Sequence, residues 1–439
     1  MNGDFLEFGT PYTSLDANLY CDIDISSNCA ESSYGWYPIG GAYSGTFDGQ
    51  GNSISGLFIN RPEGTYQGLF KYLTAGTIKN LTLVNPYAIT GDFSGLLVGQ
   101  MAYSTVAAVV DNCHVIGGSI VNDEGEDGIA TNISLGSITS RNYGGIIKDC
   151  SSSATVYIPA QGTNNSNNGV GGICGVNTRS GTTSPYGEIV GCEFSGIVFG
   201  HISAAGIAAV NTGGYVAGCT NYGFIKGSSY VGGVVGFNTG TAIAVASVNH
   251  GNTLGAGGLT AGTIGRQAAY MHGCYNTGVY VCTNTSQITI GLITGYSPEN
   301  AGVATGNTSG NYYYYDKYKV VDFLKSLYSD GYITTIVDYE QIITGEEDED
   351  EETSLPFRYN VYWAFGGTVS NSPGTDYTGA GQGAASITAL NTAVNAMNSA
   401  SASTVWASYF ASGSFTATYT YYFMPGASAT TDYPYPVQY

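Results

Sequence analysis

The chain has 439 residues, of which 65 are Gly, 37 are Tyr and only 10% are charged, a composition that suits tight turns and stacked polar side chains better than helical surfaces. With 12 Lys and Arg against 32 Asp and Glu, the formal net charge is −20. Nucleic acid and anionic membrane surfaces are therefore not expected as partners, because the release of phosphate counterions cannot drive binding. No apolar run approaches the ~20 residues of a membrane-spanning helix, so we expect no membrane span.

Residues 1–44 precede the repeated part of the chain and are predicted to cap its N-terminal end, since an open strand edge invites pairing. Met1 to Asp4 provide neither the basic nor the apolar part of a signal peptide. The Gly-, Ser-, Thr-, Asn- and Tyr-rich composition is nevertheless typical of exported proteins. We therefore expect an extracellular or cell-surface protein whose signal peptide is absent from this sequence. Cys21 and Cys29 lie in this polar segment and are the best candidates for a disulfide.

A repeated pattern begins near residue 45 and ends near residue 316. It is clearest in 231–238, 261–267 and 290–297, where a Gly, two small or apolar residues, a second Gly and a polar residue occur in succession. A fixed period between 20 and 50 residues is the signature of a solenoid, in which one structural unit is copied and stacked. The marker glycine of each unit is found at Gly68, Gly95, Gly136, Gly172, Gly206, Gly233, Gly262 and Gly291.

The units are predicted to be built from strands. Val, Ile, Leu and Phe occur in short runs that are interrupted by Gly, Asn, Thr and Ser, as in strands between turns. No long run with helical period occurs between residues 68 and 297. We therefore expect an all-β fold, a parallel β-helix (solenoid) of about eight coils, succeeded by a small C-terminal α+β module. Successive coils would lie about 4.8 Å apart.

A second column lies about thirteen residues after each marker. Because Leu and Ser occupy this position as well as Cys, it is predicted to be a small interior site that holds reduced, buried thiols. A disulfide between neighbouring coils remains an alternative on distance. The column comprises Leu81, Cys113, Cys150, Cys192, Cys219, Ser247, Cys274 and Tyr312.

Several of these segments resemble the GLUG-repeat family of bacterial surface proteins. The resemblance rests on 47–57 (FDGQGNSISGL), 68–70 (GLF), 76–81 (GTIKNL), the repeated Gly-Gly-x-x-Gly-x-Asn and the closing 310–316 (GNYYYYD). It implies a β-solenoid, export and an adhesin-like stalk or binding surface, commonly in gut Bacteroidetes, and it implies no catalytic residue. Some relatives carry an immunoglobulin A peptidase label, but none of the four histidines here begins a His-Glu-x-x-His motif.

Two insertions interrupt the repeat, at 119–130 and 158–169, and stacking is expected to place them side by side. Extra residues on a rigid scaffold are common binding sites, although two solvated turns are the simpler alternative. The first insertion offers carboxylates whose oxygens would suit a Ca²⁺ ion as cofactor: Asp123, Glu124, Glu126 and Asp127. The second offers amides for ligand binding: Asn164, Asn165, Asn167 and Asn168. Tyr186 lies in a further insertion, 178–187, which is predicted on a different edge.

The chain changes character after Asp316. An amphipathic helix is predicted over 318–329, and the acidic run 346–352 completes a linker that spans 317–352. Residues 353–439 are predicted to form an α+β module or cap. It contains a predicted strand at 357–363, a predicted helix at 384–399 and an aromatic run at 419–423.

Three functions fit these observations. An exported, non-catalytic, monomeric protein that binds glycan or a host or cell-surface protein fits the repeats and the low charge. A polysaccharide-cleaving β-helix is the second reading, although fold analogy alone does not make Lys71, Lys79, Arg141 or Lys148 catalytic. A structural fibre or phage tail component is the third, and trimerisation would distinguish it. The sequence indicates no catalytic residue, and His250 is read as a turn residue.

Overall fold

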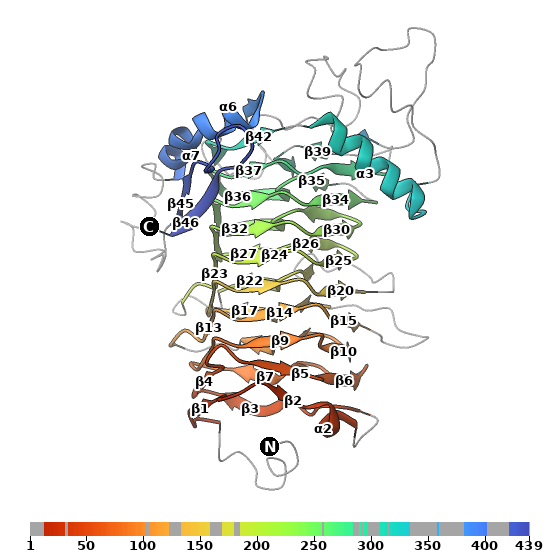
Figure 1. Ribbon diagram of the computed structural model, residues 1–439, viewed down its shortest axis with the longest axis vertical. Coiled ribbons are helices and arrows are strands. Elements are labelled where there is room, and N and C mark those ends of the chain that lie inside the picture. Colours follow the sequence, from red (N-terminus) through yellow and green to blue (C-terminus); the bar gives the residue numbers. More distant parts are fainter. Residues whose placement is uncertain are drawn as a thin grey trace.

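The computed structural model describes most of the chain, and its coils stack into one rod that has β1 (Ala17–Asn18) at one end (Figure 1). The C-terminal segments pack against the opposite half of that rod. The described residues are 13–30, 34–101, 105–122, 133–158, 169–179, 185–256, 259–283, 289–291, 293–296, 308–314, 316–333, 358–359, 382–401 and 421–438.

Four sheets, here named A to D, run along the rod. A complete coil passes twice through sheet A and then through B, C and D, and the coils before β11 have no strand in sheet D. Sheet A has 17 strands: β1 (Ala17–Asn18), β3 (Ile39–Tyr43), β4 (Thr46–Asp48), β7 (Phe70–Leu73), β8 (Thr77–Lys79), β12 (Val98–Met101), β13 (Val109–Asp111), β17 (Thr139–Tyr143), β18 (Ile146–Lys148), β22 (Cys174–Thr178), β23 (Glu188–Val190), β27 (Ala208–Thr212), β28 (Tyr215–Ala217), β32 (Val235–Val245), β36 (Ile264–His272), β40 (Thr294–Tyr296) and β41 (Thr308–Ser309).

The strands of the other three sheets have two to four residues each. Sheet B comprises β2 (Ile23–Asp24), β5 (Ser53–Ser55), β9 (Thr82–Val84), β14 (His114–Ile116), β19 (Ser151–Ser152), β24 (Glu193–Phe194), β29 (Thr220–Asn221), β33 (Val248–Asn249), β37 (Tyr275–Asn276), β42 (Tyr312–Tyr314) and β44 (Gln382–Ala384). Sheet C comprises β6 (Phe58–Arg61), β10 (Tyr87–Thr90), β15 (Ser119–Asn122), β20 (Thr155–Tyr157), β25 (Ile197–Phe199), β30 (Phe224–Gly227), β34 (Asn252–Gly255), β38 (Tyr280–Cys282) and β43 (Arg358–Tyr359). Sheet D comprises β11 (Ser94–Gly95), β16 (Leu135–Gly136), β21 (Val170–Gly171), β26 (Ser203–Ala205), β31 (Tyr230–Gly232), β35 (Leu259–Ala261) and β39 (Thr289–Gly291).

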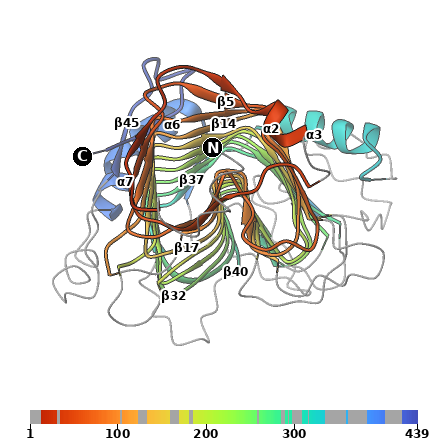
Figure 2. The same cartoon turned by 90° about the horizontal axis from the view of Figure 1, so that it is seen from below.

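The predicted parallel β-helix of about eight coils is confirmed. Within sheets A to D of the described chain, every strand pair is parallel except β38 with β43. Seen from the end, the coils superpose and share one indented outline (Figure 2). Apolar side chains from all four sheets point inward and form one continuous core along the rod, as the short apolar runs of the sequence predict.

The marker glycines form two neighbouring columns, not the single column that the sequence predicts. Gly95 pairs with Gly136, and Gly136 pairs with Gly171 and not with Gly172. Because Gly171 and Gly172 are both glycine, the sequence pattern does not distinguish the two registers. The second column lies one residue later and comprises Gly172, Gly206, Gly233 and Gly262.

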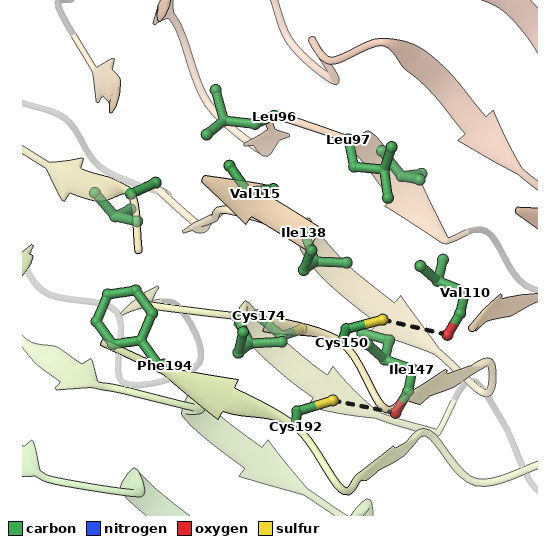
Figure 3. Close-up of a cluster of buried hydrophobic side chains, with 14 of the residues drawn as sticks. Leu96, Leu97, Val110, Val115, Ile138, Ile147, Cys150, Cys174, Cys192 and Phe194 are labelled. Carbon is green, nitrogen blue, oxygen red and sulfur yellow. Dashed lines mark hydrogen bonds between the residues drawn. The ribbon is translucent and has the colours of Figure 1, made fainter. Parts of the chain in front are cut away.

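The cysteine column is confirmed for seven of its eight positions, which directly precede successive strands of sheet B. The eighth position is Asn311, one residue before the predicted Tyr312, and its side-chain oxygen accepts a hydrogen bond of 2.9 Å from the Cys274 amide. Each thiol of the column lies against backbone carbonyls, as Figure 3 shows for Cys150 beside Val110 and Cys192 beside Ile147, both at 3.6 Å. The column therefore belongs to the core.

The residue directly before each column position lies at a corner of the coil, and it is Asn, Asp or Gly in all coils but one. The backbone adopts a positive φ at each of these corners, and these three residue types tolerate that conformation best. Ala246 is the exception, with a φ of 46°. The corner residues are Asn80, Asn112, Asp149, Gly191, Gly218, Ala246, Gly273 and Gly310.

All nine cysteines are free thiols, so the predicted disulfide between Cys21 and Cys29 is not present. Cys21 is exposed in the loop before β2, whereas Cys29 is buried in α2 (Ser26–Ala30), where its sulfur accepts a hydrogen bond from the Phe58 amide. Folding thus separates two residues that are close in sequence. Burial raises the pKa of Cys174 and of Cys274 to about 12, so these core thiols are unreactive in the folded protein.

These observations predict a thiol titration with two distinct stoichiometries. We expect one fast-reacting thiol per chain in the native protein and nine in denaturant without reductant, because only Cys21 is exposed. The measurement is a colorimetric thiol assay, and Cys21→Ser serves as the control that removes the fast phase. Fewer than nine thiols in denaturant would show that some of them are oxidised.

Stacking begins earlier than predicted, inside the segment 1–44. Strand β1 pairs in parallel with β4, and β2 pairs with β5, so Ala17 already belongs to the rod. At the other end β44 adds a further strand beside β42. The described parts of both predicted end segments therefore contribute strands as well as helices.

The helix predicted at 318–329 is confirmed as α3 (Lys317–Ser329), capped by the Asp316 carboxylate. Its apolar side packs on the outer face of sheet C, where Val320 and Leu324 join Leu254 and Val281 in one buried cluster. The helix covers only the C-terminal end of that face. The rest of the outer face of sheet C is not covered by α3.

The C-terminal module packs on the flank of sheet A. The helix predicted at 384–399 is divided into α6 (Ile387–Thr392) and α7 (Val394–Ser401). The buried Asn391 near the end of α6 donates its side-chain N–H groups to the Ala429 and Asp432 carbonyls, which ties α6 to the last hairpin. That hairpin consists of β45 (Tyr421–Met424) and β46 (Tyr435–Gln438), which are antiparallel. The linker residues 334–357 and most of the predicted strand 357–363 lie outside the described residues.

Candidate binding site

The two predicted insertions leave the rod from neighbouring coils. β15 pairs with β20 and β16 pairs with β21, so both insertions connect sheet C to sheet D at the same corner. Thirteen residues lie between Val121 of β15 and Leu135 of β16, and twelve lie between Tyr157 of β20 and Val170 of β21. Only four residues lie between Phe199 of β25 and Ala204 of β26, which are the partners of Tyr157 and Val170 in the next coil. The insertions are therefore nine and eight residues longer than this short connection.

The first insertion starts later than the sequence predicts. Residues 119–122 form β15, and Asn122 is buried, with its side-chain nitrogen donating to the Thr90 carbonyl at 3.1 Å. The predicted ligand groups of both insertions lie outside the described residues: Asp123, Glu124, Glu126, Asp127, Asn164, Asn165, Asn167 and Asn168. Their binding roles stay predictions. Within the described ranges, no group of three or more His, Cys, Asp and Glu side chains is arranged to hold a metal ion.

Tyr186 lies on a different edge, as predicted, and the structure does not place it at the corner of the two insertions. Its insertion joins the two parts of sheet A, and its ends meet where the Gly187 amide donates to the Thr178 carbonyl at 3.1 Å. The Arg179 guanidinium lies 4.5 Å from the centre of the Tyr186 ring and donates to its hydroxyl at 2.9 Å. The ring also packs against the core of the C-terminal module. These contacts give Tyr186 a structural role, and its predicted role in binding stays a prediction.

The outer face of sheet C changes character on the coils that carry the insertions. One column of this face runs in strand register through Phe58, Tyr87, Ser119, Thr155, Ile197 and Phe224. The rings of Phe58 and Tyr87 are stacked, with centres 6.0 Å apart and an interplanar angle of 4°. Among these six positions, only Ser119 and Thr155 have small side chains, and the column continues to Asn252 under α3. Sequence reasoning missed this feature, because the six residues are far apart in the chain.

The early-coil cations are engaged with other side chains. Lys79 lies 3.3 Å from the Asp48 carboxylate, and Lys148 lies 3.6 Å from both Asp111 and Asp149. These strands are in register, so acid and base alternate along one flank of sheet A. Burial raises the pKa of Asp149. Such part-exposed ion pairs contribute little stability, about 0–1 kcal/mol each.

Lys71 and Arg141 lie elsewhere, near aromatic rings. The Lys71 ammonium is 5.7 Å from the centre of the Tyr72 ring, and the Arg141 guanidinium is 3.9 Å from that of Phe93. Arg141 also donates to the Tyr143 hydroxyl at 2.9 Å. The structure therefore does not bring the four candidate cations together into one site.

His250 is more than a turn residue, because the C-terminal hairpin covers it. Its ring is stacked on Tyr222 and lies 4.9 Å from the ring of Tyr433, while Nδ1 is 2.7 Å from the Thr277 hydroxyl. Burial, with the nearby Lys319 charge, lowers the pKa of His250 to about 3. Burial also lowers the pKa of His272 to about 4. Both imidazoles are thus neutral in the folded protein near pH 7.

These two histidines predict acid destabilisation. Their folded-state pKa values lie below the ordinary 6.5, so the unfolded chain takes up protons first, and stability present above pH 6.5 is lost as the pH falls toward 4 and 3. The expected slope is at most about 1.4 kcal/mol per pH unit for each histidine. Denaturant unfolding at pH 7, 6 and 5 measures this slope. In His250→Gln the free energy of unfolding should depend less on pH. An unchanged slope in that variant would contradict the assignment.

Comparisons with known proteins give limited matches. No family model matches the chain. A 98-residue segment is 37% identical to a protein of Evansella cellulosilytica named "Putative Gly-rich membrane protein", and the match covers 21% of this chain and 11% of that protein. The crystal structure of "a putative immunoglobulin A1 protease from Bacteroides ovatus" is similar with a TM-score of 0.34 and 16% identity, over 69% of this chain and 68% of that one. Among the helices of the described residues, none is long and apolar enough to cross a membrane.

Proposed function

We propose that this protein is an exported, non-catalytic binding rod of the GLUG-repeat type, which recognises a glycan or a host or cell-surface protein at the corner between sheets C and D. The main support for the proposal is the position of the two insertions. They lie on adjacent coils, at a corner where the connection in the next coil is short. A uniform rod presents equivalent surfaces, whereas recognition needs groups of different chemistry at one place.

Further support comes from composition and similarity. The excess of acidic over basic residues agrees with an uncharged or protein ligand better than with a polyanion. The match to a Gly-rich membrane protein of Evansella cellulosilytica agrees with a surface location, although it spans 11% of that protein. A Ca²⁺ ion held by the carboxylates of the first insertion would stiffen this corner.

Trimming the insertions tests the proposal. Residues 123–132 and 159–168 would each be shortened toward the length of the Gly200–Ile202 connection, which joins the same two sheets. The trimmed rod should keep its thermal stability, since the strands remain, and should lose binding on an array of glycans and host extracellular proteins. Shortening 180–184, on the other edge, is the matched control and should leave binding unchanged. Unchanged binding by the trimmed protein would refute the proposal.

A polysaccharide-cleaving activity is the second candidate, and one observation favours it. Lys148 lies between two carboxylates, and burial raises the pKa of one of them, Asp149. Raised carboxyl pKa values are typical of general acids. The ion pairs that engage the Lys148 ammonium argue against its acting as a base. Release of reducing ends or unsaturated sugars that is lost in Lys148→Ala would establish the enzyme instead of the binding rod.

A further inference from the structure

The outer face of sheet C has a gap two coils wide in a column of large side chains. Tyr87 and Ile197 bound the gap along the rod, and Ser119 and Thr155 lie between them. We call these four residues the notch. The strands that carry Tyr87 and Ile197 are three strand intervals apart, or about 14 Å at the ordinary strand spacing.

Both walls of the notch are open to solvent. Tyr87 is 41% exposed and Ile197 is 38% exposed. One face of the Tyr87 ring stacks on Phe58. The strand register places the small Ser119 beside its opposite side, so that face of the ring is not covered by a neighbouring strand.

The floor of the notch is polar. Ser119 and Thr155 are half-buried and point outward, since the next residues in each strand, Ile120 and Val156, point into the core. In the described part of the chain, neither hydroxyl makes a hydrogen bond with another protein group. Tyr157 flanks the floor, two residues from Thr155 on the same face, with its ring edge-on to Phe199 at 5.5 Å.

We propose that the notch binds one pyranose ring of a neutral glycan, stacked on Tyr87 and hydrogen-bonded to the hydroxyls of Ser119 and Thr155. An aromatic face beside donor and acceptor hydroxyls matches the two surfaces of a sugar, an apolar C–H face and a polar rim. No charged side chain belongs to the notch, so a neutral sugar fits better than an acidic one.

The position of the notch on the rod supports its assignment as a binding site. The floor residues lie on β15 and β20, the same two strands from which the insertions leave. Two independent departures from regularity, one in connection length and one in side-chain size, thus fall on the same pair of coils. This inference rests on the proposed function and names its ligand class and the residues that contact the ligand.

Two kinds of substitution test the proposed sugar site: one fills the notch and the other removes its aromatic ring. Ser119→Tyr would continue the Phe58–Tyr87 stack into the notch, so the melting temperature should stay equal or rise while sugar binding is lost. Tyr87→Ala should weaken binding about tenfold, the value of one aromatic contact. Tyr87→Phe should bind as the wild type does. Tyr20→Ala is the control. Tyr20 is an exposed residue in the loop between β1 and β2, which belong to sheets A and B, and its replacement should leave sugar binding unchanged.

The probe is a set of neutral hexasaccharides of β-linked glucose, mannose, galactose and xylose, measured by isothermal titration calorimetry on the full chain. Wild-type binding that is lost in Ser119→Tyr and reduced in Tyr87→Ala would support the notch. Binding that is lost on trimming the insertions but kept in Ser119→Tyr would overturn the notch and leave the proposed function standing. If the wild type bound none of these sugars, the notch and the glycan branch of the proposed function would both fall.

Discussion

Replacing Gly233 by alanine is expected to destabilise the rod by more than about 4 kcal/mol, a loss large enough to unfold many proteins. A Cβ atom at this position would lie 2.1 Å from the side-chain carbon of Asn249 and 2.3 Å from the Gly262 carbonyl oxygen of the next coil. The carbonyl belongs to a backbone that is held by hydrogen bonds on both sides, so it cannot move away without breaking the stack.

Gly40→Ala is the matched control for this prediction. A Cβ atom there would meet only the Pro38 carbonyl oxygen, at 3.7 Å, which is ordinary contact. The effect should stay within about 0.5 kcal/mol. Chemical denaturation of both variants measures the difference, and a Gly233→Ala protein as stable as Gly40→Ala would show that neighbouring coils can separate locally.

Asn211→Asp is expected to have the second largest effect, because it breaks a buried amide ladder. Asn211 accepts a hydrogen bond from Asn177 at 3.0 Å and donates one to Asn238 at 2.9 Å. The ladder continues from Asn238 to Gln267 at 3.0 Å. A carboxylate at position 211 would still accept from Asn177, but it would face the Asn238 side-chain oxygen without a proton to donate.

The expected cost is about 3–5 kcal/mol at pH 7, since a buried charge is left without compensation. The new carboxyl would have a raised pKa, so its protonated form would donate again and part of the stability would return as the pH is lowered. Asn112→Asp is the control: it changes an exposed member of a similar ladder, where Asn112 donates to Asn80 at 2.9 Å. Denaturant unfolding at pH 7 and 5 measures both, and equal costs would contradict the prediction.

The fold was largely predictable because its columns consist of unusual residues. Cys113, Cys150 and Cys192 mark one interior position, and the glycines mark where coils approach too closely for a Cβ atom. The register between coils was predictable only to within one residue, since Gly171 and Gly172 are adjacent. Likewise the spacing after the marker places the eighth column position at Tyr312, one residue after Asn311, because the distance from marker to column varies slightly between coils.

The binding-site features were less predictable, because they depend on which residues lie side by side across coils. Ser119 and Thr155 are ordinary strand residues in sequence, and their significance appears only between Tyr87 and Ile197. The cover over His250 comes from Tyr433, nearly two hundred residues away in the chain. The insertions were predictable from spacing alone, since nine and eight extra residues remain visible when the coils are aligned.

The C-terminal module has a mechanical consequence for the rod. The hydrogen bonds between coils run along the rod axis, so tension between the two ends loads them one coil at a time, as in peeling. The module's buried cluster contains Val190, Ala217 and Val245, which lie on three successive coils. Tyr421 and Phe423 of the module pack against side chains of these three coils. Separating the coils would require these side chains to slide past one another. A rod pulled from both ends should therefore come apart from its N-terminal half, while the coils under the module stay together.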